Sequence, residues 1–274
     1  MNNFFPIGLE GKVAAVTGAG GAICGAIADA LARRGVSTAV WDLSAEAARK
    51  RVAAITAAGG KAAAMACDVL DPVSVDAAAE ETLRAFGAID ILINGAGGSR
   101  KQATTSEDLS FFDILPDELM RTLALNYQGA VLCSQRVGRI LAEKRAGVIL
   151  NIASIAGLKP LTRAVGYCNG KAALVSFTQW LAVHMAQEYS PKIRVNAMAP
   201  GFVLTDQNRF LLVDEKTGEP TERGRQIVSH VPLGRYGAVG EMVGTALWLV
   251  SDASEFVTGA VVPVDGGFSA YSGV

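Results

Sequence analysis

Seven short runs of β-branched and other apolar residues alternate along the chain with amphipathic, alanine-rich stretches of helical length. This alternation predicts a parallel sheet with helices on both faces, and nearly continuous apolar strands are typical of a sheet buried on both sides. The predicted strands are Val13–Thr17, Ser37–Asp42, Lys61–Cys67, Ile89–Asn94, Gly147–Ile152, Ile193–Ala197 and Ala260–Val264. The predicted helices are Ala22–Arg34, Ala45–Ala58, Val73–Phe86, Asp117–Lys144, Tyr167–Tyr189 and Gly240–Ser251. The predicted fold class is therefore α/β, with one doubly wound parallel sheet of about seven strands.

Two long stretches interrupt this alternation, and both follow the C-terminal end of a predicted strand. They are Gly97–Leu115, which is polar, and Gly201–Gly240, which contains the charged segment DEKTGEPTERGRQ. Long insertions in compact domains are commonly functional loops or surface excursions. Open α/β sheets bind ligands at the C-terminal ends of their strands. We therefore predict one domain over residues 1–274, in which about residues 205–235 form a mobile lid over a substrate.

Charge and composition exclude several classes of function. The chain has 274 residues, half of them hydrophobic, so one large core is available. A formal net charge of −1 lacks the basic footprint of a nucleic-acid binder, and no apolar run is long enough to cross a bilayer. The N-terminus lacks a secretion signal, and four scattered cysteines predict reduced, buried thiols. Two histidines without a ligand cluster predict no metal site. We expect a cytoplasmic protein that binds small molecules, not nucleic acid or membranes.

The segment TGAGGAIC joins the first predicted strand to the first predicted helix. Its glycines permit a tight turn, and the free N–H groups at the start of the helix can bind a pyrophosphate. A glycine-rich turn that binds no phosphate is the alternative interpretation. The residues predicted to contact a nucleotide here are Gly18, Gly20, Gly21, Ala22 and Ile23.

Two carboxylates at the ends of the next strands favour the nucleotide interpretation. Asp42 ends the second strand, where a carboxylate can accept hydrogen bonds from an adenosine ribose. Asp68 and Val69 follow the third strand. Either carboxylate could instead cap the following helix. No Arg or Lys between Gly18 and Gly25 is present to bind a 2′-phosphate, so Asp42 predicts NAD as the cofactor, with NADP less favoured.

Ser154, Tyr167 and Lys171 form the pattern that most directly indicates catalysis. Ser154 follows a predicted strand, and Tyr167 and Lys171 are spaced i, i+4, so they share one helix face. A phenol has a pKa near 10, so at neutral pH it keeps its proton and is unable to act as a base. A neighbouring ammonium group favours the phenolate and lowers this pKa. Such a pair also occurs by chance on many helices. Its place inside a nucleotide-binding pattern indicates a proton-transfer site.

Together these segments resemble a short-chain dehydrogenase/reductase over nearly the whole chain. The family's loop reads T-G-x-x-x-G-x-G, and Ala22 and Cys24 stand here in place of the last two glycines. The resemblance implies a single NAD(P)-binding Rossmann-fold domain whose loop still binds, with two small residues replacing glycine. The motifs that carry it, in family order, are TGAGGAIC, CDV with Asp68, NGAG at 94–97, LNYQG with Asn126, Ser154 with YCNGK, APGFVLT at 199–205 and PVDGG.

The resemblance also implies roles for individual residues. Tyr167 would be the general acid/base, and Lys171 would lower the pKa of this tyrosine and hold the nicotinamide ribose. Ser154 would hydrogen-bond the substrate oxygen, and Asn126 would position a water that continues a proton relay. A homotetramer is implied, with the predicted helices 117–144 and 167–189 at one interface. The other implied cofactor contacts are Asp42, Asp68, Val69, Asn94, Gly95, Ala96, Pro200, Gly201, Val203 and Thr205.

Basic and polar residues are expected around the substrate. Arginine binds carboxylates bidentately, so they predict a polyhydroxylated, anionic substrate, although each could equally be an ordinary solvated charge. Arg209 is the leading candidate for the carboxylate contact, and an ion pair with Asp206 is its alternative role. The candidate substrate ligands are Arg100, Arg163, Asn208 and Arg209, with Ser99, Lys101, Gln207 and His230 beside them.

The segments FTQWLAVHMA, TDQNRFLL and VDGGFSAYSGV resemble the D-mannonate (fructuronate) oxidoreductase-like subgroup of this family. They predict an enzyme that interconverts a secondary alcohol and a ketone on a sugar acid. Another polyol or sugar dehydrogenase, for gluconate or for sorbose and sorbitol, is one alternative. A 3-ketoacyl-carrier-protein reductase is a second, and it would require a basic docking patch. A non-catalytic nucleotide-sensing protein is the third, and it would need none of Ser154, Tyr167 and Lys171.

Overall fold

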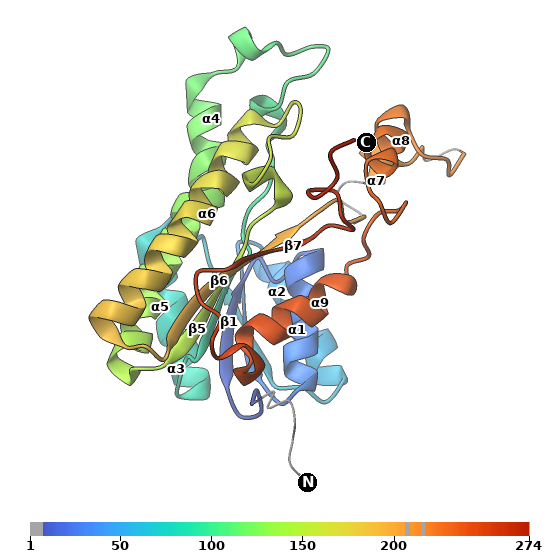
Figure 1. Cartoon of the computed structure of the whole chain (residues 1–274). Coiled ribbons are helices and arrows are strands. Elements are labelled where there is room, and N and C mark those ends of the chain that lie inside the picture. The colour runs from blue at the N-terminus through green and yellow to red at the C-terminus, as the bar shows by residue number, and fades with distance from the viewer. Residues whose placement is uncertain (1–7, 206–208, 215–216, 274) are drawn as a thin grey trace.

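Seven parallel strands form one sheet at the centre of the protein (Figure 1). The computed structural model describes residues 8–205, 209–214 and 217–273. The strand order is β3-β2-β1-β4-β5-β6-β7, so the direction of winding reverses between β1 and β4. The predicted fold class is confirmed. The strands are β1 Val13–Thr17, β2 Ser37–Asp42, β3 Ala62–Ala66, β4 Ile91–Asn94, β5 Gly147–Ile152, β6 Ile193–Pro200 and β7 Val261–Val264.

Helices cover both faces of the sheet and bury a separate apolar cluster on each. In β1, for example, Val16 points into one cluster and Ala15 into the other. Within the described ranges, no helix is long and apolar enough to cross a membrane. One face is covered by α1 Ala22–Arg33, α2 Ala45–Ala57 and α9 Glu241–Val250. The other is covered by α3 Pro72–Phe86, α5 Gly129–Lys144 and α6 Val165–His184.

Short helical elements lie in the connections, mostly at the C-terminal ends of the strands. They include two π-turns, η3 and η5, which divide or end helices that the sequence predicts as continuous. The helix predicted at 117–144 is thus two helices joined by η3, and the one predicted at 167–189 begins earlier and ends in η5. The elements are η1 Lys101–Ala103, η2 Phe111–Asp113, α4 Pro116–Leu123, η3 Ala124–Gln128, η4 Ile155–Gly157, η5 Met185–Tyr189, α7 Arg209–Leu212, α8 Glu222–Ser229 and η6 Asp252–Ser254.

Strand bounds also differ from the prediction, for reasons of pairing. β6 extends to Pro200 because its last four residues pair with β7. β4 begins at Ile91, because the Asp90 carboxylate, and not a backbone carbonyl, accepts the hydrogen bond from Val13 N at 2.8 Å. A side-chain acceptor thus takes the place of a backbone acceptor at the start of this strand pair, which an apolar pattern does not reveal.

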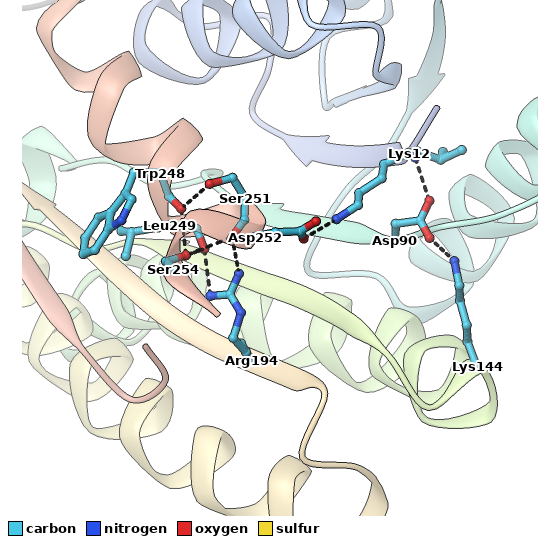
Figure 2. Close-up of polar contacts among 10 residues, drawn as sticks. Lys12, Asp90, Lys144, Arg194, Trp248, Leu249, Ser251, Asp252 and Ser254 are labelled. Atoms are coloured by element: carbon cyan, nitrogen blue, oxygen red, sulfur yellow. Dashed lines mark hydrogen bonds and ion pairs between the residues drawn. The ribbon is translucent and has the colours of Figure 1, made fainter. Parts of the chain in front are cut away.

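A buried arginine fixes α9 to the sheet (Figure 2). Arg194 of β6 donates to Leu249 O at 3.0 Å, to Ser251 O at 2.9 Å and to Val257 O at 3.2 Å. Leu249 and Ser251 lie at the C-terminal end of α9, where unpaired carbonyls and the helix dipole favour a cation. Burial lowers the pKa of Arg194, whereas nearby Asp252 raises it. The guanidinium stays charged and satisfies carbonyls that would otherwise be buried without a donor.

Backbone contacts join the two ends of the insertion that follows β6. Val203 and Gly237 form a parallel bridge, and Leu204 N donates to Gly237 O at 3.0 Å. Beyond this base, Leu212, Ile227 and Val231 form an apolar cluster of their own. The insertion therefore has its own small core.

The second half of the charged segment DEKTGEPTERGRQ is largely helical, with Glu222 and Arg225 exposed and Gly224 buried. That half continues into helix α8, which Thr221 caps by accepting from Gly224 N at 3.0 Å. Gly224 is buried so closely that a Cβ there would meet Leu212 O. The sequence looks polar because the outer face of α8 carries its charges, while the inner face packs on α7.

Candidate active site

The turn between β1 and α1 joins the ends of two strands. Gly18 has φ of +65°, and a Cβ there would lie 3.0 Å from Ala96 N, so this position requires glycine. Thr17 Oγ1 accepts from Gly95 N at 2.9 Å and from Ala96 N at 3.1 Å. The site thus forms where the sheet reverses its winding, the place where such sheets bind ligands. Thr17 begins the TGAGGAIC segment but was not among the residues predicted to contact a nucleotide.

The first turn of α1 presents unpaired backbone donors. Gly21 is its N-cap residue, no side chain caps the helix, and no acidic residue lies in the first turn. The N–H groups of Ala22 and Ile23 therefore stand at the positive end of the helix dipole. This end of the helix is suited to an anion, as predicted for a pyrophosphate.

Of the two predicted carboxylates, Asp42 ends β2 and Asp68 follows the end of β3, and neither caps a helix. Asp42 accepts from Gly20 N and from Ser44 N, both at 2.9 Å. Asp68 accepts from Leu70 N at 2.9 Å, ahead of the buried Val69. The N-caps of α2 and α3 are instead Ser44 and Asp71. The capping alternative is therefore wrong, and Asp42 holds the glycine turn against β2.

Cys24, which replaces a glycine of the family's loop, packs against Gly95. Cys24 Sγ fills the space beside Gly95, where a Cβ would overlap the sulfur and lie 2.9 Å from Thr17 O. Cys24 is buried, and burial raises the pKa of its thiol to about 12, so the thiol is neutral. The larger side chain at 24 is thus accommodated by the absence of one at 95.

Ser154, Tyr167 and Lys171 converge at the end of β5. Lys171 Nζ is buried, donates to Ile152 O at 2.8 Å and lies 5.8 Å from the centre of the Tyr167 ring. Ser154 Oγ accepts from Ala156 N at 3.1 Å, which leaves its hydroxyl hydrogen to donate elsewhere. The structure therefore brings together the three side chains that the sequence singled out.

Burial controls the proton affinities of this group. It raises the pKa of Tyr167, and the hydrogen bond with Ser154, which lowers it, is the smaller effect. Burial also lowers the pKa of Lys171 to about 8. The expectation that the pKa of Tyr167 is lowered is therefore not met in the protein alone. At neutral pH the phenol holds its proton, and the ammonium is still mostly charged.

Asn126 lies in the π-turn η3 and holds the backbone that follows β4. Its Nδ2 donates to Gly98 O and to Thr122 O, both at 2.8 Å, and its Oδ1 accepts from Gly98 N at 3.0 Å. A Cβ at Gly97 would lie 2.7 Å from Asn126 Oδ1 and 3.2 Å from Lys171 Nζ. Gly97, the last residue of the NGAG motif, therefore leaves room for the ammonium, although it was not among the predicted contacts. Single turns of π-helix such as η3 are frequent at functional sites.

The other predicted cofactor contacts differ in how their side chains lie. Asn94 turns away from the turn, since its Nδ2 donates to Ser134 Oγ at 3.0 Å and to Asn151 Oδ1 at 2.8 Å. Val203 is buried in the core and forms a bridge with Gly237. Pro200 ends β6, Gly201 follows it, and Thr205 begins the insertion. Gly201 lies so near β7 that a Cβ there would contact Asp265.

The candidate substrate ligands are not equivalent. Arg100 forms an ion pair with Glu118 of α4, with its Nε and Nη2 atoms each 3.0 Å from one carboxylate oxygen. Arg209 is exposed at the start of α7, and Arg163 is exposed in the loop before α6. Asn208, with Asp206 and Gln207, lies outside the described residues. Arg100 is therefore committed to the protein, whereas the two exposed arginines form no ion pair within residues 8–205, 209–214 and 217–273.

Comparison with known proteins identifies the family. Residues 18–269 match the family described as enoyl-(acyl carrier protein) reductase. An uncharacterised oxidoreductase of Bacillus subtilis, UxuB, is 43% identical over 97% of this chain and 98% of its own. D-Threitol dehydrogenase of Mycolicibacterium smegmatis is 37% identical over 97% and 95%. The solved structure of a candidate D-mannonate oxidoreductase from Haemophilus influenzae, with bound NAD, is 41% identical, with a TM-score of 0.91 over 97% and 98%.

The chain belongs to the short-chain dehydrogenase/reductase family, and it is an NAD(P)-dependent oxidoreductase that acts on CH–OH groups. Its own residues fit such a cofactor. The uncapped start of α1 suits a pyrophosphate, and the absence of a side chain at Gly97 leaves space beside the Lys171 ammonium. One hydrogen bond to Ile152 O leaves the Lys171 ammonium with donors for ribose hydroxyl groups.

Substitution of Gly95 tests the packing of the nucleotide turn. We expect Gly95→Ala to destabilise the protein by about 1–3 kcal/mol, because the added methyl group overlaps the buried Cys24 sulfur. Cys24→Gly should restore part of that loss in the double variant, which urea unfolding measures as a coupling energy. Gly244→Ala in α9, where a Cβ has open space, is the control and should be neutral or slightly stabilising. If Gly95→Ala lowers the free energy of unfolding equally in the wild type and in Cys24→Gly, the packing of Cys24 against Gly95 is contradicted.

Substitution of Lys171 tests the cost of the buried charge. We expect Lys171→Met to raise the free energy of unfolding at pH 7 by about 1–3 kcal/mol while activity is lost. Below pH 8 the folded protein holds an ammonium whose pKa is lowered to about 8, so folding is opposed there. As the pH rises from 8 towards 10.5, the unfolded chain binds more protons than the native protein, and the wild type regains that stability. The difference in the free energy of unfolding between Lys171→Met and the wild type, measured with urea, should therefore be smaller at pH 9.5 than at pH 7. A variant less stable than the wild type at pH 7 would refute the cost assigned to the buried charge.

Proposed function

We propose that the protein is an NAD(H)-dependent oxidoreductase that interconverts a secondary alcohol and a ketone on a sugar acid of the D-mannonate/D-fructuronate kind. The observation that carries the reaction is the buried Lys171 ammonium near the Tyr167 ring, together with a serine, Ser154, whose side chain is hydrogen-bonded to the same tyrosine. A structural role alone would not require a charged lysine in the core, because burying it costs stability.

Proton transfer is the work of the chain's own side chains. When bound, the nicotinamide ring supplies or accepts the hydride. Tyr167 gives its phenolic proton to the carbonyl oxygen of the ketone, and in the reverse direction takes the proton of the alcohol. The raised pKa of Tyr167 suits the donating direction at neutral pH. Ser154 donates to the same substrate oxygen and so holds the carbonyl within reach of the phenol.

Lys171 and Asn126 assist this proton transfer without contacting the substrate oxygen. The positive charge of Lys171 stabilises the phenolate that remains after the proton has left. Its remaining N–H donors hold the ribose next to the nicotinamide. Asn126 is a positioning residue in this protein, because its amide fixes Gly98 and with it the backbone beside Lys171. A water between Asn126 and Lys171 would continue the proton path to solvent.

The substrate class rests on the exposed basic residues and on the relatives. Arg163 and Arg209 are unpaired by any carboxylate among the described residues, and arginine binds carboxylates with two parallel hydrogen bonds. The relatives described as D-mannonate oxidoreductase and D-threitol dehydrogenase act on polyhydroxylated molecules, which supports a sugar-like substrate. A neutral polyol dehydrogenase is the second candidate, and D-threitol dehydrogenase favours it.

Assembly and compartment complete the proposal. Trp180 and Val183 expose apolar surface on α6, one of the two helices expected at a subunit interface, which supports a homotetramer. All four cysteines are buried and unpaired, which supports a reducing, cytoplasmic location.

Tyr167→Phe tests the reaction. We expect kcat for the reduction of D-fructuronate to fall about 10²- to 10⁴-fold, because the variant has no proton to donate, while the Kd for NADH stays nearly unchanged. Absorbance at 340 nm measures turnover, and NADH fluorescence measures binding. Tyr189→Phe, at an exposed tyrosine of η5, is the control and should behave as the wild type. Activity of Tyr167→Phe within a few-fold of the wild type would remove Tyr167 from the mechanism.

Cofactor preference tests the role of Asp42. We expect kcat/KM with NADH to exceed that with NADPH by about 10- to 100-fold, since the carboxylate accepts ribose hydroxyls and repels a phosphate. Arg51, which reaches the turn, is already bound to Asp29 at 2.7 Å and does not offset this repulsion. Steady-state kinetics with both cofactors decides, and equal or better kcat/KM with NADPH is the contrary result.

A further inference from the structure

We propose that Arg51 of α2 is a positioning residue for the pyrophosphate of the cofactor, on which it acts through the backbone of the glycine turn. Arg51 lies outside every motif of the family resemblance and was not among the residues predicted from the sequence. Helices α1 and α2 lie next to each other on one face of the sheet (Figure 1). The side chain of Arg51 crosses from α2 to the start of α1, where the pyrophosphate is expected.

The guanidinium of Arg51 lies along one face of α1. Gly21, Gly25 and Asp29 follow each other at intervals of four residues, so they share that face. Arg51 Nη1 donates to Asp29 Oδ2 at 2.7 Å, and Arg51 Nη2 donates to Gly21 O at 3.4 Å. The forked guanidinium thus connects a carboxylate farther along α1 with the carbonyl of the N-cap residue.

Gly25 makes room for this guanidinium. A Cβ at Gly25 would lie 2.3 Å from Arg51 Nη2 and 2.5 Å from Arg51 Cζ. Gly25 is buried inside α1, where glycine is less favourable than alanine. A glycine at this position is therefore explained by the arginine that packs on it.

The carbonyl that Arg51 binds belongs to the peptide group that offers a donor to an anion. Gly21 O and Ala22 N–H are the two polar ends of one planar peptide. Ala22 N–H is one of the groups that the start of α1 leaves without a partner inside the helix. A donor bound at one end of a peptide strengthens the hydrogen bond formed at its other end. Arg51 therefore makes Ala22 N–H a stronger donor to a pyrophosphate oxygen.

Asp29 and Arg51 contribute unequally to this effect. Within residues 8–205, 209–214 and 217–273, Asp29 Oδ1 and Arg51 Nε are buried without a hydrogen-bond partner, so the ion pair uses one oxygen only. This single contact leaves Arg51 Nη2 for Gly21 O. Loss of the Asp29 charge keeps the donor to Gly21 O, whereas loss of the Arg51 side chain removes it.

The shape of the glycine turn has support that does not involve Arg51. A Cβ at Gly20 would lie 2.7 Å from the Cβ of Ala47, which precedes Arg51 by one turn of α2. Gly20 N also donates to Asp42 at 2.9 Å. Because β2 and α2 both hold the turn, removal of Arg51 should weaken a donor without moving the backbone.

Binding of nucleotides that differ in their phosphates tests this assignment. ADP-ribose contains the pyrophosphate of the cofactor, whereas adenosine contains no phosphate. We expect Arg51→Met to raise the Kd for NADH and for ADP-ribose about 3- to 10-fold, the scale of one lost hydrogen bond, and to change the Kd for adenosine by less than about twofold. NADH fluorescence, and its displacement by each competitor, measures these constants. The measurement needs no substrate, so its outcome is independent of the proposed substrate.

Asp29→Asn separates the donor to Gly21 O from the ion pair. Arg51→Met and Asp29→Asn both remove the ion pair and should both lower Tm, but only Arg51→Met should weaken the binding of ADP-ribose. Arg51→Lys should recover part of the affinity, because an ammonium keeps the charge but lacks the fork. Arg49→Met removes the same charge from an exposed arginine of α2 that donates to Ala45 O, and it should leave all three ligands unaffected.

Three results would overturn the assignment. One is an unchanged Kd for ADP-ribose in Arg51→Met. Another is an equal loss of affinity for ADP-ribose and adenosine, since it indicates that the whole turn has moved. The last is an Asp29→Asn variant that weakens ADP-ribose binding as much as Arg51→Met, which makes the ion pair purely structural. If Arg51→Met fails to fold, the double variant with Asp29→Asn, which leaves no unpaired carboxylate, takes its place in the same comparison.

Discussion

The active site depends on one ammonium group kept inside the protein. Lys171 is buried against Ile152 O, and burial lowers its pKa to about 8. A buried charge loses its hydration, so the residues around it must compensate. Gly97 leaves space beside Nζ, and the amide of Asn126 fixes that stretch of backbone through Gly98. The ends of β4 and β5 and the π-turn η3 are thereby arranged around a single lysine.

Much of the fold was predictable because buried parallel strands have a local signature, a short apolar run bounded by polar residues. What the sequence does not reveal is set by partners far away along the chain. The π-turn η3 contains Asn126, which bonds to Gly98. Because Gly98 is distant along the chain, the sequence around Asn126 shows an uninterrupted helical pattern. Helix α8 reads as a solvated loop because its charges face outward, and its packing through Gly224 on Leu212 is a tertiary contact.

The same distinction applies to the site. The types and spacing of Ser154, Tyr167 and Lys171 indicate chemistry, and the structure brings them together. Spacing does not determine where a side chain points. Asn94 sits in the predicted motif but bonds to Ser134 and Asn151 beneath the site, and Arg100 bonds to Glu118. The partners that the fold gives Asn94 and Arg100 decide where these two side chains point, and the motif does not reveal those partners.

Catalysis and selectivity are built from different parts of this chain. Ser154 and Tyr167 act on the C–O group that every alcohol or ketone substrate has in common, so they are unable to distinguish a carboxylate from a hydroxymethyl group at the other end. Discrimination must come from segments that the sheet does not fix. Two segments of this kind stand beside the site, the loop before α6 and the insertion after β6. Because the insertion has its own apolar core around Leu212 and Ile227, it can hold a charged side chain in place without altering the catalytic residues.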